Sequence, residues 1–290
     1  MDNRWSDLGR PPLNQRALRA ALTEGLGAAW RELEVVTETG STNTDLAQRA
    51  RAGAAAGMVL VAEAQSAGRG RRGRDWTAPP RSSLTFSVLL RPSAPSGTWP
   101  WLGMLAALAV SDALRQDCGL DAWLKWPNDV LVPPGPGADL RKVAGLLSEV
   151  VSSPDGAAVV VGAGINVSQD DDELPAGTAT SLRLAGSART GRDPILRSVL
   201  RHLARRYAAW EAAGGDPRAG LAAAYRERCD TIGRMIRVQL PPDGSQSIEG
   251  VAEGVDDAGR LMLRPDGQDK GAITPLSVGD VVHIRTSERA

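Results

Sequence analysis

A glycine- and arginine-rich segment near the start of the chain is the feature that most constrains its fold. Met58 to Ala62 is apolar and predicts a short strand, and four arginines then fall within six residues among three glycines: Arg69, Arg71, Arg72 and Arg74, with Gly68, Gly70 and Gly73. Four like charges this close repel one another, so we expect the segment not to pack well by itself. Its composition is typical of a lid that becomes ordered around an anionic group.

The same segment matches the dinucleotide pattern G-x-G-x-x-G between Gly68 and Gly73. That pattern binds a pyrophosphate only where a helix follows directly, because the free N–H groups at the helix N-terminus contact the phosphate. Here two consecutive prolines, Pro79 and Pro80, follow within a few residues and argue against such a helix. The Rossmann interpretation therefore fails on context, and we expect side chains to bind the anion.

The bulk composition is that of a globular protein without a strong charge preference. The chain has 290 residues, of which 42% are hydrophobic and 23% charged, and its formal net charge is zero. This length allows one large domain with a small one, or two of middling size. Zero net charge argues against a general nucleic-acid or membrane binder. Met1 to Asp7 shows no signal peptide and Trp101 to Val110 is too short to cross a bilayer, so we expect a cytoplasmic protein.

Few side chains are available for nucleophilic or metal chemistry. The two cysteines, Cys118 and Cys229, are far apart and are expected to be buried thiols, and the two histidines lack metal-ligand spacing. Any reaction must therefore draw its nucleophile from the substrates. Only three lysines stand beside 31 arginines. Because an ammonium differs chemically from a guanidinium, Lys125 and Lys142 are candidates for positions that require lysine.

The hydrophobic pattern predicts mixed strands and helices up to about residue 230, and short strands only beyond it. Expected strands cover 33–37, 58–62, 83–90, 122–126, 130–132, 141–151 and 157–167, and expected helices 12–22, 46–51, 99–118, 193–213 and 217–229. Alternating runs at 236–240, 247–255, 260–263 and 281–284, separated by turns such as Asp243-Gly244, predict a small β-barrel. We therefore expect a preamble over 1–30, a main domain over 31–230 and a small domain over 231–290.

Two short segments suggest ligand contacts. Ser41, Thr42 and Asn43 stand directly before an expected helix, where a single N-cap residue would suffice. The surplus of side chains that both donate and accept hydrogen bonds favours a small polar ligand. In a buried strand further along, Gly162 and Gly164 predict the close approach of a ligand or of another backbone.

Five segments, in order along the chain, resemble those of the biotin–protein ligases: Gly40 to Asn43, Gln65 with Gly68 to Arg74, Lys125 to Asp129, Arg141 to Gly145, and Gly162 to Asn166. One such motif would be weak evidence, whereas five in order are strong. The resemblance covers 33–290 and implies an α+β fold. It consists of a mixed β-sheet with flanking helices, like that of class II aminoacyl-tRNA synthetases, and a small C-terminal SH3-like β-barrel.

The resemblance also implies a two-step reaction. The carboxylate of biotin attacks the α-phosphorus of ATP to give biotinyl-5′-AMP and pyrophosphate, and a lysine amine of a biotin carboxyl carrier domain then attacks that anhydride. ATP and biotin are substrates, Mg²⁺ accompanies the nucleotide, and the acceptor belongs to an acyl-CoA or pyruvate carboxylase. Fixed cations in a dry pocket stabilise the charge that develops on the phosphate oxygens.

By the same resemblance, each matching residue has an expected role. The expected catalytic residues are Lys142, Arg69 and Arg71. Biotin is expected to contact Ser41, Thr42, Asn43, Gln65, Gly68, Arg69, Gly70, Arg71, Lys142, Gly162 and Gly164. ATP is expected to contact Arg71, Arg74, Trp76, Lys125, Asn128, Asp129, Lys142 and Asn166. No residue is assigned to a metal, and the oligomeric state is left open.

Several assignments have alternatives. Arg72 is expected to be a solvated loop charge, Trp76 is either a lid anchor or a wall of the site, and Asp129 either contacts the metal or pairs with Lys125. The 133–138 loop is several residues longer than the family's usual connection, and it either projects outward or covers ATP.

The function also has alternatives. Some family members carry an N-terminal winged helix that binds operator DNA; the family core begins here near Leu33, so we expect no repressor function. Two rival functions are a ligase for another acid, such as lipoate or octanoate, and a non-enzymatic nucleic-acid-binding module. The arginine-rich lid favours biotin over the other acids, and zero net charge argues against the module.

Overall fold

The computed structural model describes residues 9–23, 29–240, 245–267 and 272–284. Its main sheet contains β1 (Glu32–Val36), β2 (Met58–Ala62), β3 (Ser83–Leu90), β4 (Trp123–Lys125), β5 (Asp129–Val132), β6 (Arg141–Ser153) and β7 (Gly156–Asn166). The helices are α2 (Gln15–Thr23), α3 (Thr42–Arg51), α4 (Trp101–Cys118), α5 (Arg192–Ala212) and α6 (Leu221–Arg228). Most of these bounds lie within a few residues of the expected ranges.

The main sheet is mixed. Its strand order is β1-β2-β3-β7-β6-β5-β4. β1 and β2 pair in parallel, whereas each of the other neighbouring pairs is antiparallel. The predicted α+β fold, with a mixed sheet in the main domain, is confirmed.

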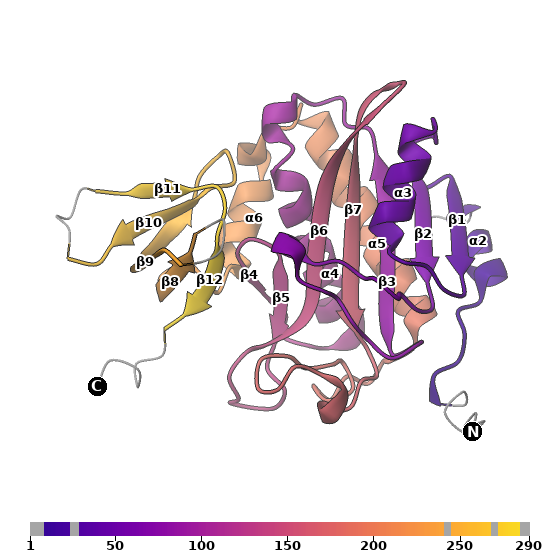
Figure 1. Ribbon diagram of the computed structural model, residues 1–290, viewed down its shortest axis with the longest axis horizontal. Helices are drawn as coiled ribbons and strands as arrows, with labels where there is room; N and C mark the ends of the chain where they lie inside the picture. The colour runs from indigo at the N-terminus through magenta and orange to yellow at the C-terminus, as the bar shows by residue number, and fades with distance from the viewer. Residues whose placement is uncertain (1–8, 24–28, 241–244, 268–271, 285–290) are drawn as a thin grey trace.

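Helices cover both faces of this sheet (Figure 1). α3 lies on one face, and α4, α5 and α6 lie on the other. Along β3 the side chains alternate: Leu84, Phe86 and Val88 belong to the large core under α4 and α5, whereas Leu89 belongs to the small core under α3. This two-residue period is what a strand covered on both faces requires.

The α3 face of the sheet changes in character along the strands. Leu89, Val151 and Val160 pack against Leu46 and Ala50 of α3. Residues at even spacing from these along each strand share that face. Beyond the N-terminus of α3 most of them are small or polar: Thr85, Ser87, Gly145, Gly162 and Gly164. Leu147 is the apolar exception. The helix covers the apolar part of the face and leaves the polar part open.

The N-terminal residues pack onto the main domain. Leu18 and Trp30 are buried in its large core. Arg192 of α5 forms a buried ion pair with Glu63 at 2.6 Å, and the Leu13 N–H donates to the same Glu63 carboxylate at 2.6 Å. The predicted preamble is thus attached to the sheet through Glu63, at the end of β2.

A second, all-β unit follows α6. Its strands are β8 (Met235–Gln239), β9 (Ser247–Val255), β10 (Leu261–Pro265), β11 (Thr274–Leu276) and β12 (Asp280–His283), in the order β11-β10-β9-β8-β12. β11 was not predicted, and the turn predicted at Asp243-Gly244 lies outside the described residues. The indole N–H groups of Trp101 and Trp126 donate to the carbonyls of Asp257 and Gly259, which joins the two units. Among the described helices, none is both long and apolar enough to span a membrane.

Candidate active site

Nearly all of the predicted site residues line two cavities. The first cavity lies on the α3 face of the main sheet, beside the N-terminus of that helix, and measures about 120 Å³. A Cβ on Gly162 would lie 2.0 Å from Asn43 Oδ1, and a Cβ on Gly164 would lie 2.4 Å from the Trp76 ring. Side chains of the protein itself make the close approach at these glycines, whereas the prediction named a ligand or another backbone. The cavity floor includes residues paired across β3, β7 and β6: Thr85, Gly164 and Gly145 in one row, and Gly162 with Leu147 in the next. Ser87 pairs with Gly162 in that second row and is buried beside the floor.

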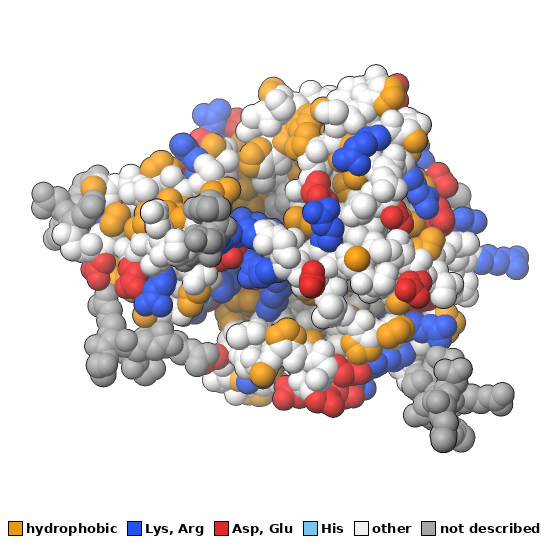
Figure 2. All heavy atoms as spheres, viewed as in Figure 1, with side chains coloured by type: hydrophobic (Ala, Val, Ile, Leu, Met, Phe, Trp, Pro, Cys, Tyr) orange, Lys and Arg blue, Asp and Glu red, His pale blue; other side chains and the backbone are white. Residues whose placement is uncertain are grey.

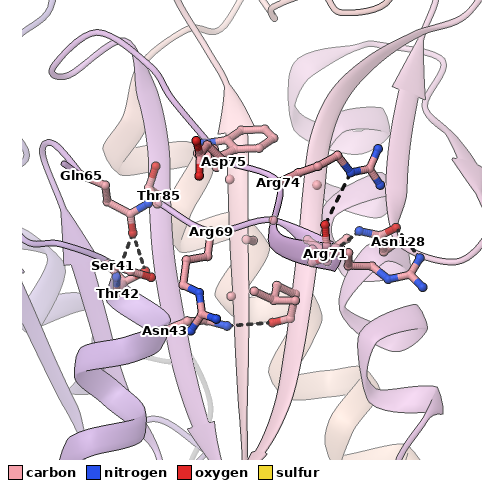
Figure 3. A pocket seen from close by; sticks show the side chains of 18 of the residues that line it. Ser41, Thr42, Asn43, Gln65, Arg69, Arg71, Arg74, Asp75, Thr85 and Asn128 are labelled. Atoms are coloured by element: carbon pink, nitrogen blue, oxygen red, sulfur yellow. Dashed lines mark hydrogen bonds between the residues drawn. The ribbon is translucent and has the colours of Figure 1, made fainter. Parts of the chain in front are cut away.

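Hydrogen bonds between neutral side chains hold one end of this cavity (Figure 3). Gln65 Oε1 accepts from the backbone N–H of Thr42 at 2.8 Å and from its hydroxyl at 3.1 Å. Ser87 Oγ lies 2.8 Å from Thr42 Oγ1 and donates to Asn43 Oδ1 at 2.6 Å. Ser41 is the N-cap residue of α3, yet its hydroxyl does not cap the helix, and it lines the cavity instead. The polar side chains beyond the single one that an N-cap needs therefore form a polar wall of the cavity.

The arginine-rich lid is folded rather than loose. Gly70 N–H donates to the Arg74 carbonyl at 2.6 Å, and Trp76 N–H donates to the Gly68 carbonyl at 2.9 Å. Arg72 donates to Asp280 of β12 at 3.0 Å, and Arg74 donates to the same carboxylate at 2.6 Å. Arg72 is exposed, as predicted, but it is not only a solvated loop charge: the Asp280 carboxylate of the second unit offsets the repulsion within the lid.

Trp76 connects the lid to the floor. Its ring lies against Gly164 and Gly145, and Lys142 Nζ lies 5.6 Å from the ring centroid. Its Nε1–H is buried and has no hydrogen-bond partner among the described residues. Trp76 is therefore both an anchor of the lid and a wall of the cavity.

Lys142 lies at a β-bulge, where the register between β5 and β6 shifts. A bulge redirects side chains. The main chain of Lys142 pairs with Leu131 of β5 on one side and with a segment after β7 on the other. Lys142 N–H donates to Thr178 O at 3.0 Å, and Thr180 N–H donates to Lys142 O at 2.9 Å. Lys142 Nζ lies 2.7 Å from Asp129 Oδ1. Of the two alternatives for Asp129, the ion pair is present, but its partner is Lys142 and not Lys125.

A second, larger cavity of about 1060 Å³ opens between the lid, the β4–β6 end of the sheet and the second unit. Figure 2 shows Lys and Arg side chains gathered at the hollow between the two units. Burial lowers the pKa of Lys125 in its wall, and nearby Asp129 partly opposes this effect. Its charged lining residues are Arg74, Asp75, Lys125, Asp129, Asp139, Lys142, Asp230, Arg234 and Asp280.

Comparison with known proteins agrees with this geometry. Residues 35–166 match the Biotin/lipoate A/B protein ligase family, and residues 231–284 match the Biotin protein ligase C terminal domain. The chain is 44% identical to the biotin--[acetyl-CoA-carboxylase] ligase of Mycobacterium tuberculosis, over 95% of this chain and 97% of that one. The chain belongs to the biotin/lipoate protein ligase family. The resemblance inferred from the five motifs is confirmed.

Other family members extend the comparison. The biotin--[acetyl-CoA-carboxylase] ligase of Paracoccus denitrificans is 35% identical over 79% of this chain and 93% of its own length. The structure titled biotin protein ligase from Aquifex aeolicus in complex with biotin and ATP superposes with a TM-score of 0.70 at 26% identity, over 89% of this chain and 100% of that one. The bifunctional ligase/repressor BirA of Bacillus subtilis is 31% identical over 87% of this chain and 74% of its own length.

The structure gathers nearly all the residues that the family motifs singled out. Those lining the first cavity are Ser41, Thr42, Asn43, Gln65, Arg69, Gly70, Arg71, Arg74, Trp76, Asn128, Lys142, Gly162 and Gly164. Those lining the second are Arg74, Trp76, Lys125, Asp129, Lys142 and Asn166. Gly68 lines neither cavity; a Cβ there would lie 2.3 Å from the Trp76 carbonyl, so its role is to let the lid fold.

Two of the residues predicted to contact ATP, Asn128 and Asn166, have their polar side-chain atoms engaged by the protein. Asn166 Nδ2 donates to Thr180 O at 3.0 Å, and its Oδ1 accepts from Gln169 at 3.1 Å. Asn128 donates to Leu146 O at 2.8 Å and accepts from Arg71 at 3.3 Å. ATP contacts of both asparagines remain predictions.

Sequence reasoning missed Ser87, Glu149 and the segment over 178–180. Ser87 and Glu149 lie on the same face as the glycines, at even spacing along their strands, and this spacing was the available signal. The 178–180 segment had no comparable signal, because it contacts Lys142 through its backbone. The 133–138 loop lines neither cavity, although Asp139 and Leu140 beside it line the second.

Proposed function

We propose that this chain is a biotin–protein ligase, which joins biotin to AMP and then passes the biotinyl group to a lysine of a carrier domain. One observation carries the proposal: Lys142 and Trp76 line both cavities. An ammonium group at that junction stands where two ligands, one in each cavity, would meet. Activation of an acid by a nucleotide requires such a meeting.

The first cavity suits the ureido ring of biotin. That ring is neutral, and it carries both N–H donors and a carbonyl acceptor. The wall formed by Thr42, Asn43 and Gln65 presents donors and acceptors in fixed positions. A site with buried polar groups rejects an analogue that cannot pair with them, because those groups would lose their partners. Lipoate and octanoate lack the ureido group, so the cavity favours biotin over them.

The second cavity suits the nucleotide. A triphosphate is a polyanion, and Lys125, Arg74 and Arg234 supply cations in its wall. Mg²⁺ typically binds through one or two carboxylates together with substrate phosphates. Asp129 and Asp280 line the same wall and would complete such a shell. Mg²⁺, when bound with ATP, would neutralise charge on the phosphates.

In the first step, a biotin carboxylate oxygen attacks the α-phosphorus of ATP and pyrophosphate leaves. Lys142, Arg69 and Arg71 line the first cavity, and in this proposal each stabilises negative charge that develops in the transition state. Trp76 and the folded lid exclude water from the anhydride. In the second step the acceptor amine attacks the biotinyl carbonyl carbon and AMP leaves, so the protein supplies no nucleophile.

The direct test is incorporation of labelled biotin into a purified carboxyl carrier domain, with and without ATP. We expect ATP-dependent labelling of a single lysine. ATP–pyrophosphate exchange with biotin, lipoate and octanoate separates the proposed acid from its rivals. Exchange with lipoate or octanoate in place of biotin would refute the assignment.

Other expectations about the biological setting remain predictions. These are an acyl-CoA or pyruvate carboxylase as the source of the acceptor, a cytoplasmic location and the absence of repressor function. A specific complex of the purified chain with operator DNA would overturn the last of them. Salt-sensitive retention on DNA without biotin-dependent exchange would instead favour the nucleic-acid-binding module.

A further inference from the structure

Glu149 of β6 lies next to Asn43 but does not line the first cavity. Its Oε2 accepts a hydrogen bond from Asn43 Nδ2 at 2.9 Å, and the Leu147 carbonyl accepts from the same nitrogen at 3.2 Å. On the other side of the amide, Ser87 Oγ donates to Oδ1. A primary amide has two N–H donors and one oxygen with two lone pairs. Both donors of Asn43 are therefore used, and one lone pair on Oδ1 remains.

These neighbours determine which end of the amide faces the cavity. Turning the amide over would place Oδ1 against a carboxylate and a carbonyl, which are both acceptors. Glu149 makes the stronger of these two contacts, because a charged acceptor strengthens the hydrogen bond. A Cβ on Gly162 would lie 2.0 Å from Asn43 Oδ1, so the oxygen stands directly over the cavity floor.

We propose that Glu149 is a positioning residue for biotin. It holds the Asn43 amide so that its oxygen, and not its NH₂ group, faces the cavity and accepts an N–H of the ureido ring. The inference rests on the proposed function, and it adds a residue outside the five family motifs.

Glu149 has a second neighbour that the test must separate. Arg69 Nη1 of the lid lies 3.9 Å from Glu149 Oε1. Loss of the carboxylate would therefore remove both an acceptor for Asn43 and a charge near Arg69. Glu149→Gln keeps an acceptor oxygen and removes the charge, whereas Glu149→Leu removes both at similar side-chain size.

Glu34 provides a matched control. It also lies on a strand of the main sheet, its side chain is 32% exposed against 33% for Glu149, and it pairs with Arg49 at 2.5 Å. It lines neither cavity. Glu34→Leu therefore reports the general cost of replacing a half-buried, paired glutamate.

The measurements are the biotin Kd by calorimetry, the KM values for biotin and ATP in pyrophosphate exchange, and thermal unfolding. We expect Glu149→Leu to weaken biotin binding roughly tenfold or more, since the Asn43 amide loses its fixed orientation. We expect Glu149→Gln to stay within about threefold of the wild type, because an acceptor remains. The KM for ATP should barely change in the Glu149 variants. The biotin affinity of Glu34→Leu should also stay close to that of the wild type.

A double-mutant cycle with Asn43→Ala completes the test. If Glu149 acts through Asn43, Glu149→Leu should add no further loss of biotin affinity in that background. Additive losses, or equal losses in Glu149→Gln and Glu149→Leu, would overturn the inference while wild-type exchange stays intact. A wild-type chain without biotin binding or exchange would instead overturn the proposed function itself.

Discussion

The two cavities differ in how they are built. The α3 end of the first is built mainly of neutral side chains from one unit, joined by hydrogen bonds such as Gln65 to Thr42 and Ser87 to Asn43, with Glu149 and Arg69 beside them. The second is made of charged side chains from both units and the lid, including Lys125, Arg234 and Asp280. The first is about 120 Å³ and the second about 1060 Å³.

This difference matches two kinds of recognition. A neutral ring is discriminated by buried polar groups whose orientation is fixed, because an unpaired partner is costly. A polyanion needs opposing charge more than exact placement, since Coulomb attraction acts over longer distances. Lys142 and Trp76 line both cavities and so connect the region that recognises a neutral ring with the region that recognises a polyanion.

The largest effect on activity should come from Lys142, at the junction of the two cavities. We expect Lys142→Ala to raise the barrier of adenylate formation by at least ~2 kcal/mol, as for the loss of one transition-state donor. Biotin-dependent ATP–pyrophosphate exchange measures it. Arg141→Ala is the control, because Arg141 is the adjacent residue, with only a 4.0 Å ion pair to Asp171. Near-normal exchange in Lys142→Ala would show that Lys142 does not stabilise the transition state of adenylate formation.

The next effect should be confined to the first cavity. A Cβ on Gly162 would lie 2.0 Å from Asn43 Oδ1 and 3.1 Å from Ser87 Oγ. We expect Gly162→Ala to weaken biotin binding about tenfold by displacing these polar groups, with little change in the ATP KM. Gly254→Ala in β9 is the control, because nothing lies within 4 Å of its Cβ position. An equal loss of both ligands would show that the cavities are not separate.

A smaller effect concerns the lid. Asp280→Ala removes the carboxylate shared by Arg72 and Arg74, so trypsin should cut between 69 and 74 several times faster in the free protein. Biotin with ATP should slow cutting in the wild type. Asp256→Ala in the same unit is the control, because its partner is Arg260. Cutting that is indifferent both to Asp280→Ala and to ligand would contradict the lid model.

The smallest effect is on stability and depends on pH. Burial, followed by the nearby charge of Lys125, lowers the pKa of His283 in the second cavity to about 4. Because the unfolded histidine binds a proton at higher pH than the folded one, stability should fall as pH drops from about 6.5 toward 4. The loss is on the order of 1 kcal/mol once partial exposure is allowed for.

His283→Gln should remove this part of the pH dependence, as followed by urea unfolding at several pH values. His202→Gln is a comparison variant away from both cavities, where His202 lies against Asp112. Burial also lowers the pKa of His202, so this variant should remove the separate part of the pH dependence that His202 contributes. A pH profile that is unchanged in His283→Gln would show that this histidine does not titrate in the predicted range.

Much of the site could be predicted because its signals are local. Each of these signals lies within a short stretch of sequence: the five motifs, the two glycines of β7 and the strand before the lid. The spacing of hydrophobic residues and the residues that favour turns can be read from such a stretch alone. The buried state of Cys118 and Cys229, both unpaired, was also predictable from their spacing.

By itself, the sequence determined the family and the mixed α+β architecture, and nearly all the site residues that it predicted line one of the two cavities. Most of the lining of the second cavity was not predicted. Only the tertiary structure decided that Asp280 binds the lid, that Asp129 pairs with Lys142, that 178–180 holds the Lys142 backbone and that Glu149 contacts Asn43. The physical reason is sequence separation: Asn43 and Glu149 are 106 positions apart, and Arg74 and Asp280 are 206 apart. Pairings of this kind depend on which strands become neighbours and on their register, which no local pattern contains.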